Sequence, residues 1–447
     1  MATVLPASAS PPGSSSAPPS ATPAPRRPSP MTRRLVSLDA YRGLIMTMLA
    51  ASGFGIAQLA RLPKDAPVWD VLDYSFWQRL AFHFEHTPWV SNFNWWQVSF
   101  WDLIQPAFMF MVGVAMPYSY ARRASRGHSA VRRFGHAVWR GVVLVLIGVF
   151  LRSLHYSTTH WVFIDVVAQI GLGYVILYAL MEGGRWAQGI GFAVILIGYY
   201  VLFLTYTPPA DYDYDAVFAS KARGEVFDGR FSHWSKNANI GYRFDLWFLH
   251  QFPRPPEEKV ISHHRGGYVT LNFIPSIATM LLGLFCGQLL RAPGNRFLKF
   301  VYLALSGVVL IAVGAAAGEY VCPVVKRIWT PSWVLFSGGW VILGLAVLYL
   351  LFDVLQVGWL ARPVRWLAFP LAVIGMNSIA VYLMGWLIRD FTVHNIHIHF
   401  QPMLERLLGA EMLADNMLGR VVDPTAAFIV FWLIAVWMYR QRFFVRV

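Results

Sequence analysis

Long apolar stretches recur along the chain, separated by shorter polar links. Each has about the 20 residues that a helix needs to cross the hydrocarbon core of a bilayer. Stretches of this length favour helices over barrel strands, because a helix satisfies its own backbone hydrogen bonds in lipid. We therefore predict an all-α fold, a polytopic membrane bundle of about ten transmembrane helices. The predicted spans are 41–60, 99–120, 138–155, 162–181, 187–206, 270–290, 298–317, 332–352, 367–388 and 424–440.

The composition supports a membrane protein and excludes several other classes. Apolar residues make up 56% and charged residues 13% of the chain, whereas soluble proteins carry about 25% charged residues. Cys286 and Cys322, the two cysteines, lie in or beside apolar segments, which argues against a disulfide framework or a cysteine metal site. Residues 1–32 are rich in Pro, Ala and Ser and are predicted to be a disordered cytoplasmic tail. Residues 33–447 are predicted to form the membrane domain.

Basic residues gather in alternate links between the predicted spans, which orients the chain. With ten spans these links fall on one side, and the positive-inside rule places that side in the cytoplasm. The net charge of +14 then reflects loops facing anionic lipid, and we predict no nucleic-acid partner. Both termini are expected to be cytoplasmic, in the cell (inner) membrane, and 61–98, 207–269 and 389–423 to be outer loops. The basic positions are Arg26, Arg27, Arg33, Arg34, Arg122, Arg123, Arg126, Arg132, Arg133, Arg140, Arg185, Arg291, Arg296, Lys299, Arg362, Arg365, Arg440, Arg442 and Arg446.

Two basic features on the predicted cytoplasmic side could contact phosphates. Asp39 and Arg42 lie three residues apart at the start of the first span, so they share one helix face. This pattern fits a capped helix end as well as a phosphate contact. Guanidinium groups in the link after the second span, Arg122, Arg123 and Arg126, could hold the phosphates of a nucleotide cofactor or simply form a solvated face.

A histidine on the predicted outer side precedes the second span. His86 could act as a general base, because an imidazole titrates close to neutral pH. Asp102 lies inside the outer end of that span, where an unpaired carboxylate is costly, so a histidine or a basic residue should pair with it. His83 and Glu85 are nearby competitors of His86.

Further polar residues outside or within the bilayer suggest substrate contacts. Asn239 and Asp245 lie among aromatic residues in the second outer loop, a mixture typical of sugar binding and of interfacial anchoring alike. Lys326, close to Trp329, breaks the positive-inside pattern, which suggests that a specific contact holds it outside. Asn377 and Ser378, at membrane depth, need a partner or a cavity.

Three histidines in the last outer loop raise the question of a metal. His394, His397 and His399 are close in sequence, but alternation along a loop or strand would place only two of them on one face. No carboxylate is adjacent to them, so we predict no metal site.

Several sequence motifs occur together in one order along most of the chain. With them the chain resembles the family of heparan-alpha-glucosaminide N-acetyltransferase and its bacterial relatives. Each motif is weak alone, and the specificity lies in their order. The motifs occupy residues 34–43, 86–89, 102–113, 169–174, 267–287, 326–332 and 369–378.

The resemblance implies a multi-pass acyltransferase that uses cytoplasmic acetyl-CoA and a sugar amine on the opposite side of the membrane. The family's active-site histidine matches His86. The segment between His86 and Asp102 is longer than the family's pattern, so His83 remains an alternative. The resemblance does not fix the acceptor, since the loop 207–269 also departs from the family.

We therefore predict an acyl-CoA-dependent acyltransferase that modifies a sugar amine or hydroxyl of a glycan. His86 would be the base or acyl carrier, and Asp102 would orient it. Arg42 and the arginines of the 121–140 link would hold CoA, and Lys326, Trp329 and Asn377 would line the acyl path. The alternative is a transporter or flippase of a glycan precursor, which intramembrane polar residues also fit. The partners expected are acyl-CoA, the acceptor and membrane lipids, and the oligomeric state stays open, a homo-oligomer included.

Overall fold

The computed structural model describes residues 35–91, 98–256, 258, 265–355 and 361–445. The chain divides into two units, Met1–Leu35 and Val36–Val447, and the description below concerns the second. The predicted tail 1–32, four of the predicted cytoplasmic arginines (Arg26, Arg27, Arg33 and Arg34), Arg446, and parts of the outer loops at 92–97, 257 and 259–264 lie outside the described residues.

Every regular element among the described residues is helical, which confirms the all-α prediction. The longer helices are α1 (Val36–Ala50), α4 (Phe100–Ser125), α5 (Ala130–Ser153), α6 (Val166–Glu182), α7 (Gly184–Leu204), α9 (Phe273–Arg291), α10 (Arg296–Tyr320), α11 (Pro331–Tyr349), α12 (Ala361–Met376), α13 (Ser378–Leu387), α14 (Arg389–Leu408) and α15 (Gly419–Arg440). The short helices are α2 (Ile56–Ala60), at the end of the first predicted span, and α3 (Tyr74–Phe82) and α8 (Ile240–Phe248), in the predicted outer loops.

The described helices confirm the prediction of a multi-pass membrane protein. They agree only approximately with the predicted number of about ten spans. Among the described residues seven helices are long and apolar enough to cross a membrane, and the number rises to as many as nine if each of two bent pairs is one span. The span predicted at 162–181 corresponds to α6, which is apolar but has only 17 residues. Each predicted span therefore has a helical counterpart, although three of the ten are short or broken.

The first span is broken, contrary to the prediction of one helix over 41–60. Its two parts, α1 and the segment Ser52–Ala60, meet at an angle of 49°. At the break Gly53 and Gly55 have positive φ, a backbone conformation that suits glycine. Arg389 donates hydrogen bonds to the carbonyls of Leu49 and Ala50, at 3.2 and 2.8 Å, so the carbonyls freed at the break gain a partner.

The ninth predicted span is also broken, and a helix follows it where a loop was predicted. α12 and α13 meet at 70° around Asn377. The region 389–423, predicted as an outer loop, contains the polar helix α14 over its first part. The loop or strand conformation predicted around His394–His399 is wrong, because these residues lie within α14.

Glycines allow the central helices to approach each other closely. A β-carbon placed on Gly113 of α4 would lie 1.8 Å from the carbonyl oxygen of Met280 in α9, and one on Gly283 would lie 2.0 Å from that of Phe110. Gly43 of α1 stands in the same relation to α12. Such small-residue crossings let helices pack in lipid, where apolar surface gives little drive to associate.

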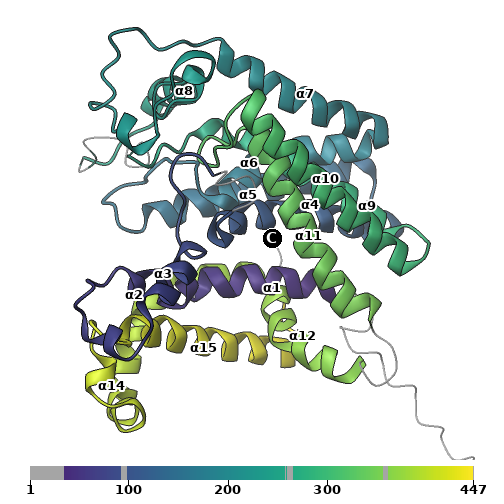
Figure 1. The fold of residues 1–447 in the computed structure, drawn as a ribbon. Coiled ribbons are helices and arrows are strands. Elements are labelled where there is room, and N and C mark those ends of the chain that lie inside the picture. Colours follow the sequence, from purple (N-terminus) through teal and green to yellow (C-terminus); the bar gives the residue numbers. More distant parts are fainter. Residues whose placement is uncertain (1–34, 92–97, 257, 259–264, 356–360, 446–447) are drawn as a thin grey trace, which may run out of the picture. The chain divides into compact units, whose positions relative to one another are not determined.

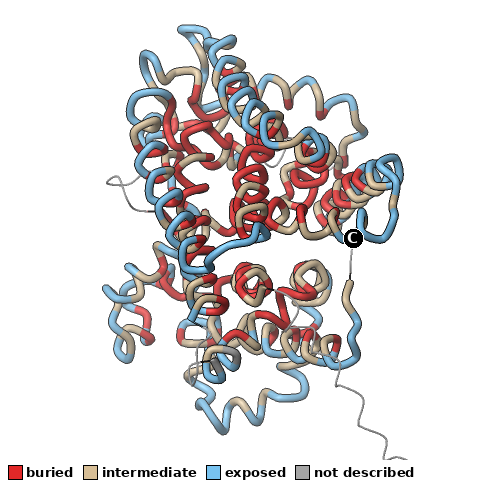
Figure 2. The backbone as a smooth tube through the Cα atoms, turned by 90° about the vertical axis from the view of Figure 1, so that its right-hand side faces the viewer, coloured by how far each residue is buried: buried red, intermediate tan, exposed pale blue. Residues whose placement is uncertain are grey.

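α1 connects two groups of helices within this unit. One group contains α4 to α11, with α4 and α9 at its centre, and the other contains α12 to α15 (Figure 1). Buried residues concentrate where helices face each other, whereas the outer faces of α5, α7 and α10 remain exposed, as expected for helices that meet lipid (Figure 2). The short helices α2, α3 and α8 and helix α14 are spread along the left side of the bundle in Figure 1, with α8 at the top and α14 at the bottom.

Candidate active site

The segment before α4 folds back over the first turn of that helix. Ser99 caps α4, since its Oγ accepts a hydrogen bond from the backbone N–H of Trp101 at 3.2 Å. The same hydroxyl donates to the carbonyl of Glu85 at 2.6 Å. These contacts hold the 83–91 segment beside Asp102, which lies in the first turn of the helix.

Asp102 is buried and accepts hydrogen bonds from this segment on both of its oxygens. Its Oδ1 lies 2.8 Å from Nδ1 of His86. Its Oδ2 accepts from the backbone N–H of Thr87 at 3.2 Å and from the Thr87 hydroxyl at 2.6 Å. The carboxylate therefore fixes both the position and the ring orientation of His86.

Lys326 brings a buried positive charge to the same carboxylate. Its Nζ lies 3.0 Å from Oδ1 of Asp102 and 3.4 Å from Nδ1 of His86. The segment that carries Lys326 precedes α11, whose N-cap is Thr330. Two buried charges of opposite sign stabilise each other here, since either one alone would be strongly unfavourable.

The surroundings of His86 favour its neutral form. Burial lowers the pKa of His86 below its ordinary value, and the charge of Lys326 lowers it further, while the hydrogen bond to Asp102 acts in the opposite direction. Because an ionised carboxylate only accepts hydrogen bonds, Nδ1 must carry the proton that faces Asp102. Nε2, on the other side of the ring, then presents a lone pair.

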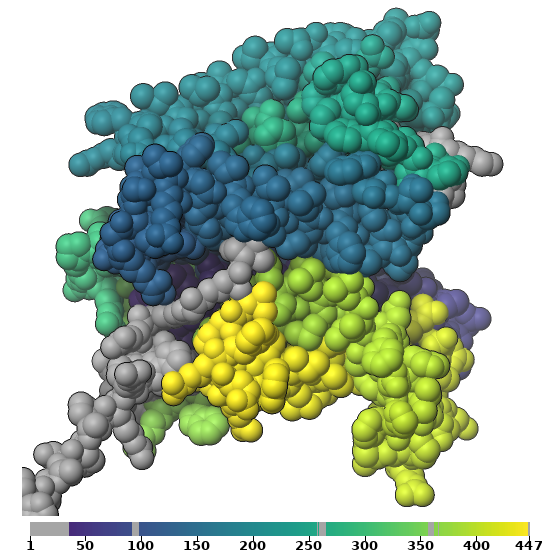
Figure 3. Space-filling model, turned by 180° about the vertical axis from the view of Figure 1, so that it is seen from behind, coloured from purple at the N-terminus to yellow at the C-terminus, as the bar shows by residue number. Residues whose placement is uncertain are grey.

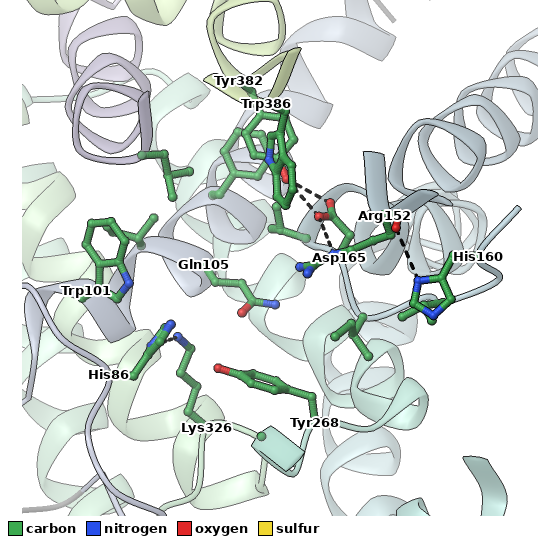
Figure 4. A pocket seen from close by; sticks show the side chains of 17 residues that line it. His86, Trp101, Gln105, Arg152, His160, Asp165, Tyr268, Lys326, Tyr382 and Trp386 are labelled. Atoms are coloured by element: carbon green, nitrogen blue, oxygen red, sulfur yellow. Dashed lines mark hydrogen bonds and ion pairs between the residues drawn. The ribbon is translucent and has the colours of Figure 1, made fainter. Parts of the chain in front are cut away.

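His86 lines a cavity of about 540 Å³. Figure 4 shows His86, Lys326 and Trp101 on one side of it, with Gln105 and Tyr268 between them and the opposite side. The cavity also has apolar lining from α1, α4 and α6, which is typical of a small-molecule site with a few placed polar groups.

The opposite side of the cavity has a second polar cluster, which we call the far wall: Arg152, Asp165, Tyr382 and Trp386. The hydroxyl of Tyr382 donates to Asp165 at 3.0 and 3.1 Å from its two oxygens. The guanidinium of Arg152 lies 3.4 Å from Asp165 and 5.4 Å from the ring centre of Trp386. α5, α13 and the start of α6 thus meet at this wall.

Two of the predicted substrate residues lie away from the cavity. Asn239 caps α8, accepting from the backbone N–H of Tyr242 at 3.0 Å. Asp245 is fully buried in the same helix and accepts from the backbone N–H of Thr270 at 3.1 Å. Both contacts fold the 207–269 region.

The other predicted lining residues also make contacts outside the cavity. Trp329 is buried and donates its indole N–H to the hydroxyl of Thr279 at 3.1 Å. Asn377 donates to the carbonyl of Phe443 and accepts from the backbone N–H of Val445, at 3.2 and 3.0 Å, and Ser378 follows it as the first residue of α13. Of the predicted acyl-path residues, Lys326 lies at the cavity.

The two candidate histidines occupy different places. His83 is the C-cap of α3 and is absent from the cavity lining, whereas His86 lines the cavity; both side chains are partly open to solvent. The structure therefore favours the position of His86 over that of His83 for contact with a bound molecule.

The predicted phosphate-binding arginines lie at the other end of α4. Arg122 and Arg123 are in its last turn and Arg126 follows as its C-cap, whereas Asp102 is in its first turn. At 1.5 Å per residue the two ends of the helix are about 30 Å apart, the thickness of a hydrocarbon core. Arg42 of α1 lies 3.4 Å from the carbonyl of Met111, in the middle of α4. None of these four arginines lines the described cavity.

Sequence reasoning missed the far wall. Arg152 is the one basic residue near the outer end of its predicted span, and Asp165 precedes an apolar run where a helix N-cap is expected. Those two positions were signals of polar residues at a membrane boundary. Nothing local in the sequence connects them with Tyr382 and Trp386.

In the described residues no group of three or more His, Cys, Asp or Glu side chains is placed to hold a metal ion. His397 of α14 instead contacts Gln401 at 2.7 Å and Asp423 at 3.0 Å.

The chain is similar to known proteins over most of its length. The family model "Heparan-alpha-glucosaminide N-acetyltransferase, catalytic" matches residues 68–214, which include His86, Asp102, Arg152 and Asp165. Heparan-alpha-glucosaminide N-acetyltransferase of Mus musculus is 23% identical over 92% of this chain, and that of Homo sapiens is 23% identical over the same share. The chain spans 60% and 59% of the length of these two relatives. The resemblance inferred from the ordered motifs is thereby confirmed.

Proposed function

We propose that this chain, which is similar to heparan-alpha-glucosaminide N-acetyltransferases, is an acyl-CoA-dependent acyltransferase. It would move an acetyl, or another acyl, group to the amine or hydroxyl of a sugar. The observation that carries the proposal is the imidazole of His86, anchored through Nδ1 by Asp102 and exposed to a cavity on its other side. The similarity to N-acetyltransferases supports acyl transfer as the reaction, and the cavity beside His86 is large enough to admit an acceptor.

The geometry supports general base catalysis by His86. Nε2 accepts a proton from the acceptor amine while the amine nitrogen attacks the thioester carbonyl carbon. A C–N bond forms, the C–S bond breaks, and the CoA sulfur leaves and takes up a proton. Asp102 stabilises the imidazolium formed in this step. Lys326 keeps the resting imidazole neutral and ready to accept the proton.

We propose that CoA phosphates bind Arg122, Arg123 and Arg126 at the arginine end of α4, together with Arg42 of α1, which lies beside the middle of α4. Phosphates are held well by guanidinium groups, which form paired, charge-assisted hydrogen bonds. The position of Arg122, Arg123 and Arg126 at the end of α4 opposite Asp102 supports a donor and an acceptor that approach from opposite faces.

We also propose an orientation in the cell (inner) membrane with both termini and the arginine end of α4 in the cytoplasm. The distribution of basic residues supports this orientation. The acceptor would then reach His86 from the outer side, where the end of the bundle carries α2, α3 and α8.

Transfer of a radiolabelled acetyl group tests this proposal directly. Purified protein in detergent receives labelled acetyl-CoA and an amino sugar, and the labelled product is counted. We expect His86→Ala to lower transfer by about 100-fold or more, the usual value of a general base. His83→Ala should retain transfer, because that side chain lies outside the cavity. Undiminished transfer by His86→Ala, or sugar movement into liposomes without consumption of acetyl-CoA, would contradict the proposal.

A further inference from the structure

Two uncharged polar side chains line the cavity between His86 and the far wall. Gln105 belongs to α4, and Tyr268 lies shortly before α9. Figure 4 shows the Gln105 carboxamide and the Tyr268 hydroxyl in the space beside His86 and Lys326. Among the described residues neither group makes a hydrogen bond to the protein. Each of them can therefore donate a hydrogen bond to a bound molecule.

The position of Gln105 follows from the register of α4. Gln105 comes three residues after Asp102, so the two side chains share one face of the helix. Asp102 lies 2.8 Å from Nδ1 of His86. One face of α4 therefore carries both the anchor of the imidazole and a hydrogen-bond donor that faces the cavity.

Arg327 connects Tyr268 with the segment that carries His86. Its guanidinium carbon lies 5.9 Å from the centre of the Tyr268 ring. Its Nη1 donates to the carbonyl of Gly266 at 3.0 Å, and its Nη2 donates at 3.3 Å to the carbonyl of Thr87, the residue after His86. These contacts hold the ring of Tyr268 close to His86, while the Tyr268 hydroxyl stays open to the cavity.

The proposed reaction places a negative charge close to Nε2 of His86. The amine nitrogen attacks the thioester carbon while Nε2 takes its proton. The carbonyl oxygen is one bond away from that carbon, so its negative charge develops near the imidazole. Preorganised hydrogen-bond donors at such a position are usually the largest single contribution to the rate of acyl transfer.

The charged groups of the cavity are placed less well for this task. The ammonium of Lys326 is bound to Asp102 at 3.0 Å, on the Nδ1 side of the imidazole. Arg152 lies across the cavity, with its Nε 3.4 Å from Asp165 (Figure 4). Figure 3 shows its helix, α5, in blue directly above the lime surface of α13 from behind, so Arg152 belongs to the contact between these two helices. The two uncharged side chains, in contrast, lie between the near side and the far wall.

We infer, on the basis of the proposed function, that Gln105 and Tyr268 form the oxyanion hole of the transfer reaction. As the C–N bond forms, the π electrons of the carbonyl move to its oxygen, which accepts hydrogen bonds from the Tyr268 hydroxyl and the Gln105 amide N–H. The electron pair returns when the C–S bond breaks, and the CoA sulfur leaves and takes up the proton that His86 holds. Gln105 and Tyr268 are thus catalytic residues that neither gain nor lose a proton.

Contact with hydroxyl groups of the acceptor is the competing role for these two side chains. The kinetic constants distinguish the two roles. Removal of a group that contacts only the oxyanion lowers kcat and kcat/KM equally, whereas removal of a contact already present in the bound ground state raises KM.

Steady-state kinetics of the full chain in nanodiscs, with labelled acetyl-CoA and methyl glucosaminide, tests the inference. We expect Tyr268→Phe and Gln105→Met each to lower kcat and kcat/KM by about 100-fold, the usual effect of losing one oxyanion donor, with both KM values unchanged. Tyr268→Phe keeps the ring that Arg327 contacts, so its Tm should equal that of the wild type. Tyr320→Phe, at a tyrosine that is 69% exposed, and Gln251→Met, at an exposed glutamine, are the matched controls and should retain kcat.

A charged variant of nearly the same size separates donation from space filling. Gln105→Glu keeps the acceptor oxygens, but an ionised carboxylate cannot donate, and its charge repels the oxyanion. Its kcat should therefore fall below that of Gln105→Met. Wild-type kcat in Gln105→Glu would overturn the inference.

The choice of sugar separates the oxyanion from the acceptor's hydroxyls. Methyl glucosaminide and methyl galactosaminide should show the same loss of kcat in Tyr268→Phe and Gln105→Met, because the oxyanion belongs to the acyl donor. A loss confined to one sugar, or a raised sugar KM with unchanged kcat, would overturn the inference. Transfer by the wild type with unchanged kcat in both variants would refute the oxyanion hole and leave the proposed function standing. A wild type that transfers no acetyl group would refute the proposed function itself.

Discussion

Nζ of Lys326 lies 3.4 Å from Nδ1 of His86, although the two residues are 240 positions apart in sequence. Both contact the same oxygen of Asp102. An ammonium group this close to an imidazole opposes its protonation, and the shared carboxylate prevents the two from separating. The arrangement therefore sets the protonation state of His86 through a residue that need not touch the substrate.

Removal of the Lys326 charge should shift the pH dependence of transfer. Burial and Lys326 lower the pKa of His86, so activity that needs the neutral imidazole is lost as pH falls through that lowered value. In Lys326→Met the pKa should rise, and the acid limb of the kcat/KM profile should move to higher pH. Lys64→Met, at an exposed residue of the loop before α3, should leave the profile unchanged. An acid limb that stays in place in Lys326→Met would show that another group titrates.

Loss of the Asp102 charge should cost both activity and stability. Asp102→Asn leaves the buried ammonium of Lys326 without its carboxylate, and breaking a buried pair in this way costs about 3–5 kcal/mol. We expect a lower Tm by differential scanning fluorimetry. Transfer should also fall, by about 100-fold or more, because the amide no longer holds His86 in the tautomer with its proton on Nδ1. The double variant Asp102→Asn with Lys326→Met should recover Tm but not transfer, and recovery of neither would point to a packing defect instead.

Substitutions at the arginine end of α4 should change KM for the donor, acetyl-CoA, and leave KM for the acceptor sugar unchanged. Neutral variants Arg122→Gln, Arg123→Gln and Arg126→Gln should each raise KM for acetyl-CoA by about tenfold, since one charge-assisted hydrogen bond contributes about 1.5 kcal/mol or more. KM for the sugar should not change. Arg185→Gln, at an exposed arginine near the start of α7, controls for surface charge. Equal effects of all four substitutions would indicate a general electrostatic effect and no CoA site.

Close helix crossings should make specific glycines intolerant of a single methyl group. Gly113→Ala would place a β-carbon 1.8 Å from the carbonyl oxygen of Met280, so α4 and α9 must separate. We expect a lower Tm and less folded protein by size-exclusion chromatography. Gly198→Ala in α7 has no heavy atom within 4 Å of the added carbon, and it should be neutral or stabilise by up to about 1 kcal/mol through helix propensity. Similar Tm values for the two variants would refute the predicted crossing.

The sequence alone predicts the near side of the site better than the far side. A carboxylate in the first turn of an apolar helix needs a partner, so the sequence predicts that a histidine or a basic residue pairs with Asp102. The structure places both His86 and Lys326 beside it. Lys326 stood out because it breaks the distribution of basic residues. In contrast, Asp165 and Tyr382 are 217 positions apart, and only the packing of α13 brings them together.

The broken spans were missed for a related physical reason. Apolarity along 41–60 and 367–388 predicts the depth of these segments in the membrane but not the continuity of the helix. Arg389 bonds carbonyls freed at the first break, and Asn377, at the second break, bonds the backbone of residues 443 and 445. Such partners are distant in sequence, so a local pattern cannot reveal them.

The hydrogen bonds of Asn377 to residues 443 and 445 connect the end of α15 with the hinge from which α13 departs. α13 carries Tyr382 and Trp386, so a truncation or fusion that displaces those last residues would release the hinge and tilt the helix that bears half of the far wall. Such an alteration would then lower activity from a distance, because the Asn377 side chain connects the end of α15 with the helix that lines the cavity.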